Sequence, residues 1–194
     1  MNSFFDQQAG AYHWNSNRGL WGWLRNREQA CIIRHLGAFT GNTVLDLGSG
    51  AGFYSSLALE HGAHEVVSVD LSQKMIEALP PDGITGVVGD ASTVLLNKHF
   101  KIIVMAGLLE FAASPSEILA NAQKHAETGA VMAILAPRKN IWGRVYRAYH
   151  RNHGVKISLF SRDQLKNLAM DAGWQYISGE TVWPFSIIMG FRAV

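Results

Sequence analysis

The chain has 194 residues, of which 48% are hydrophobic and 16% are charged, a composition typical of a globular domain rather than a disordered protein. Its net charge of +2 is too small to indicate nucleic-acid binding by itself, and no apolar run is long enough to span a bilayer. Its single cysteine, Cys31, cannot form an internal disulfide, and the first residues lack the layout of a secretory signal, so we expect a cytoplasmic protein.

Short apolar runs rich in β-branched residues alternate with segments of helical periodicity, after an aromatic and mostly helical extension over residues 1–40. We expect strands at 43–48, 64–70, 85–90, 101–106, 130–136, 174–182 and 183–193. We expect helices at 51–62, 72–80, 115–129 and 161–173, each ending at a glycine or a proline. This alternation predicts an α/β fold with a doubly wound, mostly parallel sheet and helices on both faces.

The sequence VLDLGSGAGFYSS places Gly48, Gly50 and Gly52 directly after the first predicted strand. Ligands of doubly wound sheets bind beyond the carboxyl ends of the strands, and glycine lets the backbone turn tightly and approach them. The spacing matches neither the dinucleotide fingerprint G-x-G-x-x-G nor a P-loop. Asp46 and Asp70 end the first two strands, and they suit a ligand with a ribose and a cationic amino-acid group rather than a diphosphate.

Four segments, in this order, resemble the class I S-adenosylmethionine-dependent methyltransferases: VLDLGSGAGFYS, VVSVDLSQKMIEAL, GVVGDAS and IIVMAGLLEFAASP. The resemblance covers about residues 40–136. It implies a Rossmann-like sheet of seven strands with the last one antiparallel. It also implies S-adenosyl-L-methionine as the methyl donor and S-adenosyl-L-homocysteine as the product.

The resemblance further implies which residues bind the donor. Asp46 would lie near its ammonium group, and Asp70 would hold its ribose. The other implied residues are Gly48, Ser49, Gly50 and Gly52 around the methionine portion, Leu71 against the adenine, Asp90 and Ala91 at the adenine amino group, and Ala106 and Gly107 under the sulfonium.

Methyl transfer from a sulfonium is an in-line displacement, so the protein must mainly align the reactants and exclude water. A base is needed only where the acceptor carries a proton that must leave, and the sequence shows neither a catalytic triad nor a metal-ligand spacing. Glu110 follows the strand that faces the donor, so it is a candidate for the mouth of the active site. The alternative is a helix-start residue that only favours the helix dipole.

The N-terminal segment FFDQQAGAYHWN resembles the F-D-x-x-A-x-x-Y entry of ubiquinone-biosynthesis-type and related small-molecule methyltransferases, in which this segment forms a lid. Tyr12 would stand near the donor. His13 is a candidate general base, with an ordinary surface or core histidine as the alternative. Trp21 and Trp23 either anchor the extension to the domain or form a wall for an aromatic or lipid-like substrate.

Residues 137–154 predict a basic amphipathic helix that is capped by Asn140 and ended by Gly154. One predicted face carries Ile141, Trp142, Val145, Tyr146 and Tyr149, and another carries Arg144, Arg147 and Arg151. From Thr128 to Arg162 there are seven Lys/Arg and no Asp or Glu. Such a helix can be a lid over a carboxylated substrate, a contact with a membrane surface, or a solvated helix.

We therefore expect one methyltransferase domain over residues 1–194, divided into an N-terminal lid (1–40), a donor-binding core (41–136), a basic cover segment (137–160) and a closing part (161–194). Its substrate would be a small aromatic or amphipathic metabolite. The alternatives are a lipid or quinone-precursor methyltransferase at the membrane surface and a non-catalytic binding protein on the same fold. The [DN]-P-P-[YFW] motif of amino-methylating enzymes is absent, so no nucleic-acid partner is expected.

Overall fold

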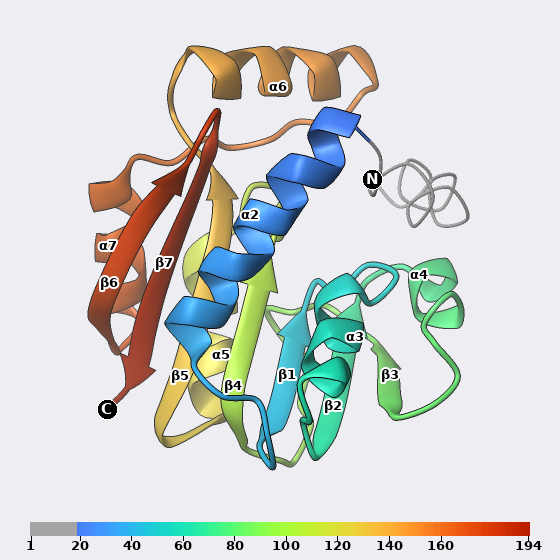
Figure 1. The fold of residues 1–194 in the computed structure, drawn as a ribbon. Coiled ribbons are helices and arrows are strands. Elements are labelled where there is room, and N and C mark those ends of the chain that lie inside the picture. The colour runs from blue at the N-terminus through green and yellow to red at the C-terminus, as the bar shows by residue number, and fades with distance from the viewer. Residues whose placement is uncertain (1–18) are drawn as a thin grey trace.

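The computed structural model of the protein describes residues 19–194, which form a seven-stranded sheet between layers of helices (Figure 1). The strands are β1 (Thr43–Leu47), β2 (Glu65–Asp70), β3 (Ile84–Val88), β4 (Phe100–Ala106), β5 (Ala126–Pro137), β6 (Trp174–Val182) and β7 (Ser186–Ala193). The helices are α2 (Gly19–Leu36), α3 (Phe53–Glu60), α4 (Gln73–Glu77), α5 (Pro115–Lys124), α6 (Ile141–Asn152) and α7 (Arg162–Asp171).

The strands lie in the order β3-β2-β1-β4-β5-β7-β6. Strands β1 to β5 pair in parallel, whereas β7 runs antiparallel to both β5 and β6. This confirms the predicted α/β doubly wound sheet with an antiparallel last strand. The chain leaves β1 on one side through β2 and β3 and returns on its other side at β4, so the strand order reverses beside β1, where such sheets bind ligands.

Successive side chains of the central strands point to opposite faces of the sheet, and each face has its own buried cluster. On β1, Val44 belongs to the cluster that contains residues of α2 and α3, whereas Leu45 belongs to the cluster with residues of α5 and α7. On β4, Ile102 and Ile103 divide in the same way. The uninterrupted apolar runs of these strands therefore serve two helical layers at once.

One predicted boundary is wrong. The helix expected over 115–129 ends at Lys124, and β5 already begins at Ala126. His125 ends the helix because its backbone oxygen accepts a hydrogen bond from Phe100 N (2.8 Å) and its ring contacts Leu96 N (3.2 Å). These tertiary contacts leave no trace in the local periodicity, so the sequence alone favours the glycine at position 129 as the helix end.

Helix α6 begins where the sequence predicts, because the side chain of Asn140 accepts a hydrogen bond from Gly143 N (2.8 Å). Its predicted apolar face, however, is not the face that packs on the domain. Gly143 and His150 are buried and Tyr146 is half-buried, whereas the other predicted apolar residues are exposed. Within residues 19–194, no helix has the length and apolar character needed to cross a membrane.

Candidate active site

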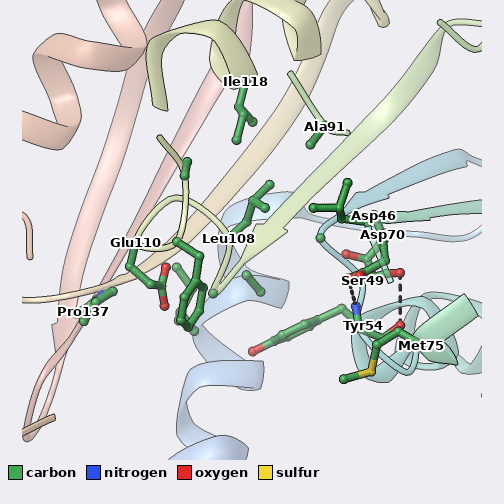
Figure 2. Close-up of a pocket in the computed structure, with 18 of the residues that line it drawn as sticks. Asp46, Ser49, Tyr54, Asp70, Met75, Ala91, Leu108, Glu110, Ile118 and Pro137 are labelled. Carbon is green, nitrogen blue, oxygen red and sulfur yellow. Dashed lines mark hydrogen bonds between the residues drawn. The ribbon is translucent and has the colours of Figure 1, made fainter. Parts of the chain in front are cut away.

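A cavity of about 870 Å³ opens at the carboxyl ends of the parallel strands β1 to β5. Because these strands are parallel, their carboxyl ends meet at one edge of the sheet and deliver residues to a common space. Figure 2 shows Asp46 and Asp70 on one side of this space and Glu110 on the other, with Leu108 between them. The cavity therefore brings together residues from the whole length of the predicted donor-binding core.

The glycine loop after β1 forms part of the cavity wall. Gly48, Ser49 and Gly50 line it, and Gly50 adopts a left-handed conformation (φ 53°) with no atom within 4 Å of where a Cβ would stand. The backbone at Gly50 is thus open to an approaching ligand. Gly52 differs from the prediction because it does not line the cavity. It is the N-cap of α3, and a Cβ there would collide with Leu79.

The carboxylate of Asp70 is held in a fixed orientation at the end of β2. Its Oδ2 accepts a hydrogen bond from Gly50 N and its Oδ1 accepts one from Ser72 N, both at 2.9 Å. Each carboxylate oxygen can accept more than one hydrogen bond. Asp70 can therefore receive two further donors from the cavity, as a pair of adjacent hydroxyl groups would supply.

The side chain of Asp46 is almost completely buried, with an exposed fraction of 1%. Ser55 Oγ donates a hydrogen bond to its Oδ2 (2.6 Å), and Ser55 is itself within 2.6 Å of Ser68 Oγ. Burial, together with the nearby charge of Asp70, raises the pKa of Asp46 to about 7. No ion pair joins Asp46 to a cationic side chain within residues 19–194. A cationic ligand group at this end of the cavity would stabilise the charged carboxylate.

The loop after β3 provides a second polar part of the cavity wall. Asp90 Oδ1 accepts hydrogen bonds from Ser92 N (2.8 Å) and Ser92 Oγ (2.7 Å), and these bonds lower the pKa of Asp90. Asp90 is therefore an ionised acceptor at the cavity wall. Ala91 is buried beside it, and Leu71, after β2, lines the same part of the cavity while staying partly exposed. All three line this end of the cavity, and their contact with an adenine stays a prediction.

Glu110 lies beyond the end of β4, close to Gly107, on the side of the cavity opposite the aspartates. It is 4% exposed, and its Oε2 has no hydrogen-bond partner among the described residues. Burial, together with the charge of Glu28, raises the pKa of Glu110 to about 8. The helix-start interpretation of Glu110 is wrong because α5 begins only at Pro115. Ala106 and Gly107 line the cavity next to it.

Several lining residues were not predicted. Glu28 of α2 accepts a hydrogen bond from Ser186 Oγ, and burial raises its pKa while the charge of Arg25 lowers it. Around Glu28 and Glu110 stand aromatic rings: Phe111, Tyr146, Tyr149, His150 and Phe185. Tyr146 stacks on Phe185, with ring centroids 5.1 Å apart and an interplanar angle of 14°. The aromatic spacing in 137–154 predicts that the rings of α6 share one face, but no sequence signal identifies Glu28 or Ser186 as cavity residues.

Trp23, one of the residues singled out in the N-terminal extension, lies outside the cavity. Tyr12 and His13, the predicted lid tyrosine and candidate base, lie outside the described residues. Trp23 does not line the cavity; it is partly exposed, with the guanidinium of Arg27 4.9 Å from its ring centroid. Helix α2 therefore contributes Leu24, Arg25 and Glu28 to the cavity wall, but not Trp23.

In the described part of the chain, Cys31, His35 and Glu180 form a group whose possible metal-ligand atoms lie within 4.8 Å of one another. None of them lines the cavity. Burial raises the pKa of the Cys31 thiol to about 12, and Arg34 holds the Glu180 carboxylate through two hydrogen bonds of 2.9 and 3.0 Å. A thiol must lose its proton to bind a metal, and the raised pKa of Cys31 disfavours that loss. The group therefore serves as a structural link between α2 and β6.

A family model described as a methyltransferase domain matches residues 7–178. No curated protein sequence matches the chain. Among solved structures, an S-adenosylmethionine-dependent methyltransferase from Mesorhizobium loti is 19% identical, with a TM-score of 0.69 over 89% of this chain and 96% of its own. Magnesium protoporphyrin IX methyltransferase from Synechocystis PCC 6803, with bound S-adenosylhomocysteine, is 15% identical, with a TM-score of 0.75 over 100% of this chain and 98% of its own.

A third structure is 1,6-didemethyltoxoflavin-N1-methyltransferase from Burkholderia thailandensis, with 1,6-didemethyltoxoflavin and S-adenosylhomocysteine bound. It is 18% identical, with a TM-score of 0.72 over 98% of this chain and 87% of its own. At these identities the three structures establish a common fold.

Proposed function

Because the chain belongs to the methyltransferase domain family, whose model matches residues 7–178, we propose that it transfers a methyl group from S-adenosyl-L-methionine to a small aromatic or amphipathic metabolite. The observation that carries this proposal is the continuity of the cavity. One space joins the aspartates and glycines at the ends of β1 to β3 to the aromatic chamber around Glu110. Its volume, about 870 Å³, is at the upper end of the usual range for small-molecule sites, as a site for two reactants requires.

The residues at the donor end fit S-adenosyl-L-methionine in charge and in hydrogen bonding. Asp70 would accept the two ribose hydroxyls, since Gly50 N and Ser72 N already fix both of its oxygens. Asp46 would face the ammonium group, which is the cation that this buried carboxyl lacks. Asp90 would accept from the adenine amino group. Two of the similar solved structures hold S-adenosylhomocysteine, which supports this assignment.

When bound, S-adenosyl-L-methionine supplies a methyl group on a positively charged sulfur that an aligned nucleophile can displace. The protein's task is to hold the nucleophilic atom in line and to exclude water. Ala106 and Gly107 present little side chain at the end of β4, so an acceptor can come close to this strand end. Glu110 stands beside Gly107 and would take the proton from the acceptor heteroatom onto its Oε2. Because the pKa of Glu110 is about 8, its ionised carboxylate is a stronger base than an ordinary carboxylate.

The acceptor end favours a ring or chain with one polar group. Phe111, Tyr146 and Phe185 offer apolar and aromatic surface, and the polar side chains among them are mainly Glu28, Glu110 and Ser186. An acceptor would bury its apolar part against the rings and direct a hydroxyl or amino group at Glu110. This arrangement supports the aromatic or amphipathic class over a fully polar sugar-like substrate.

The test is a methyl-transfer assay with the full chain and donor labelled on the methyl group, against a panel of phenols and aromatic or long-chain amines. We expect labelled product from members of this panel. The Glu110→Gln variant should turn over at least about a hundredfold more slowly, while its affinity for S-adenosylhomocysteine stays within about twofold of the wild type. Glu60→Gln, which changes an exposed acid on α3, is the matched control and should behave as the wild type.

Absence of donor binding in the wild-type chain would contradict the proposed reaction. Product formation that is equally fast in Glu110→Gln would leave the reaction standing and remove Glu110 as its base.

A further inference from the structure

The outer face of α6 is apolar and largely exposed. Ile141 is 66% exposed, Val145 58%, Tyr149 52% and Trp142 48%. At 100° per residue these four positions fall within an arc of about 100° on the helix surface. Contiguous exposed apolar surface of this kind marks an interaction site more often than free surface.

The turn between β6 and β7 enlarges this apolar face. Trp183 lies in the turn, is 58% exposed, and contacts the ring of Trp142 edge-on at a centroid distance of 6.1 Å. We refer to Ile141, Trp142, Val145, Tyr149 and Trp183 together as the α6 patch. Two tryptophans and a tyrosine beside aliphatic side chains are the composition typical of protein segments that lie at a membrane interface.

Cationic side chains lie beside the α6 patch. Arg144, Arg147 and Arg151 are exposed on the neighbouring arc of the same helix, and none forms an ion pair with a described residue. From Thr128 to Arg162 the chain has seven Lys/Arg and no acid, whereas the rest of the chain has ten Lys/Arg against fifteen Asp/Glu. The positive charge of the protein is thus concentrated on the segment that carries α6.

We propose that the α6 patch and its arginines dock the protein on the surface of an anionic lipid membrane. The aromatic and aliphatic side chains enter the boundary between headgroups and acyl chains, and the arginines bind the anionic headgroups. The charge complementarity distinguishes this partner from a second copy of the chain, because a symmetric contact would bring two basic segments together. Residues 1–18 contain one acid and one arginine, so they offer no net negative charge to cover the patch.

The same helix connects this surface to the cavity. Tyr146, Tyr149 and His150 of α6 line the cavity, while Ile141, Trp142 and Val145 face outward, and Figure 1 shows α6 lying across the end of the domain beyond the tip of β5. A protein docked through the α6 patch would hold the mouth of its cavity at the lipid surface. An amphipathic acceptor could then pass from the membrane to Glu110 without crossing bulk water.

The test is flotation of the full chain with vesicles of phosphatidylcholine, with and without phosphatidylglycerol. We expect the wild type to float with the anionic vesicles, to bind neutral vesicles much more weakly, and to dissociate as salt rises. Arg144→Gln combined with Arg147→Gln should weaken binding about fivefold for each charge removed. Ile141→Ser combined with Val145→Ser should also weaken it, because the apolar contact is lost.

Matched controls change exposed residues away from α6. Lys74→Gln combined with Lys124→Gln removes two exposed charges on α4 and α5, and Leu95→Ser removes an exposed leucine. Both controls should bind as the wild type does. Thermal unfolding of every variant checks that the fold is intact.

Three results would overturn the proposal. The first is a wild-type chain that stays free of anionic vesicles. The second is binding that both α6 double variants leave unchanged. The third is a wild type that ignores vesicles while the Ile141→Ser and Val145→Ser pair lowers the unfolding temperature or changes the sedimentation coefficient. That result would assign the patch to residues 1–18 or to a second copy of the chain.

Discussion

Asp46 and Glu110 are carboxyl groups whose pKa burial raises from 3.8 to about 7 and from 4.5 to about 8. Between the two pKa values of such a group, the folded state keeps a proton that the unfolded state has released. The stabilising contribution of the group is therefore complete below the unfolded pKa and is lost as pH rises to the folded pKa. Both residues should make the protein progressively less stable from about pH 4 to about pH 8.

Replacing Glu110 by Gln should remove its share of this loss. We compare the stability of Glu110→Gln with that of the wild type at two pH values. The free energy of unfolding of the variant minus that of the wild type should be about 1–3 kcal/mol larger at about pH 9 than at about pH 5. Urea denaturation at the two pH values measures this difference, with Glu60→Gln as the control. An equal effect of the substitution at both pH values would show that Glu110 titrates normally in the folded protein.

Asp46 should link donor binding to pH. A bound ammonium group favours the charged carboxylate and lowers the pKa of Asp46, so the donor binds more tightly as pH rises from about 5 to about 7 and then levels off. The Asp46→Asn variant should lose this pH dependence, whereas Asp82→Asn, at an exposed acid outside the cavity, should keep it. Calorimetric titration across this pH range provides the measurement. A pH dependence that survives in Asp46→Asn would assign it to another group.

Helix α6 depends on a close backbone contact at Gly143. A Cβ at this position would collide with the carbonyl oxygen of Arg138, just before the helix. We expect Gly143→Ala to lower the free energy of unfolding by about 1–3 kcal/mol, although alanine is the better helix former. Because Tyr146, Tyr149 and His150 would move with the helix, methyl transfer should slow while the donor affinity stays unchanged. Ala148→Gly is the control, since it weakens the same helix without a collision.

For Gly143→Ala, the comparison is made by urea denaturation and by titration with S-adenosylhomocysteine. A variant more stable than the wild type would mean that α6 can shift at no cost.

The positions of most elements follow from the sequence because they depend on local signals. The helices predicted from positions 72 and 161 begin directly after the N-cap residues Ser72 and Ser161, and the buried strands are recognisable as apolar runs. The end of α5 cannot be predicted from local signals. It is determined by the hydrogen bonds of His125 to Phe100 at the start of β4 and to Leu96 in the preceding loop. The packing face of α6 does not follow either, since periodicity identifies an apolar face but not whether the domain covers it.

At the scale of the whole molecule, the doubly wound sheet determines where the chemistry can occur. Strand order places the ends of β1, β2 and β4 side by side, so most of the residues predicted to bind the donor, although far apart in sequence, line one cavity. That end of the cavity could be predicted, because the resemblance and the strand ends mark the same residues. The acceptor end could not be predicted, because Glu28 reaches it only through the packing of α2 on the sheet and Ser186 only through the pairing that places β7 beside β5.

We infer that this cavity binds S-adenosyl-L-methionine through the carboxylate of Asp70. Calorimetric titration of the full chain with the donor and with S-adenosylhomocysteine tests it most directly, on the wild type and on Asp70→Asn. Loss of two charge-assisted hydrogen bonds to the ribose should weaken binding of both ligands at least about tenfold in the variant. A wild type that binds neither ligand, or a variant that binds both as tightly as the wild type, would show that Asp70 does not hold the donor in this cavity.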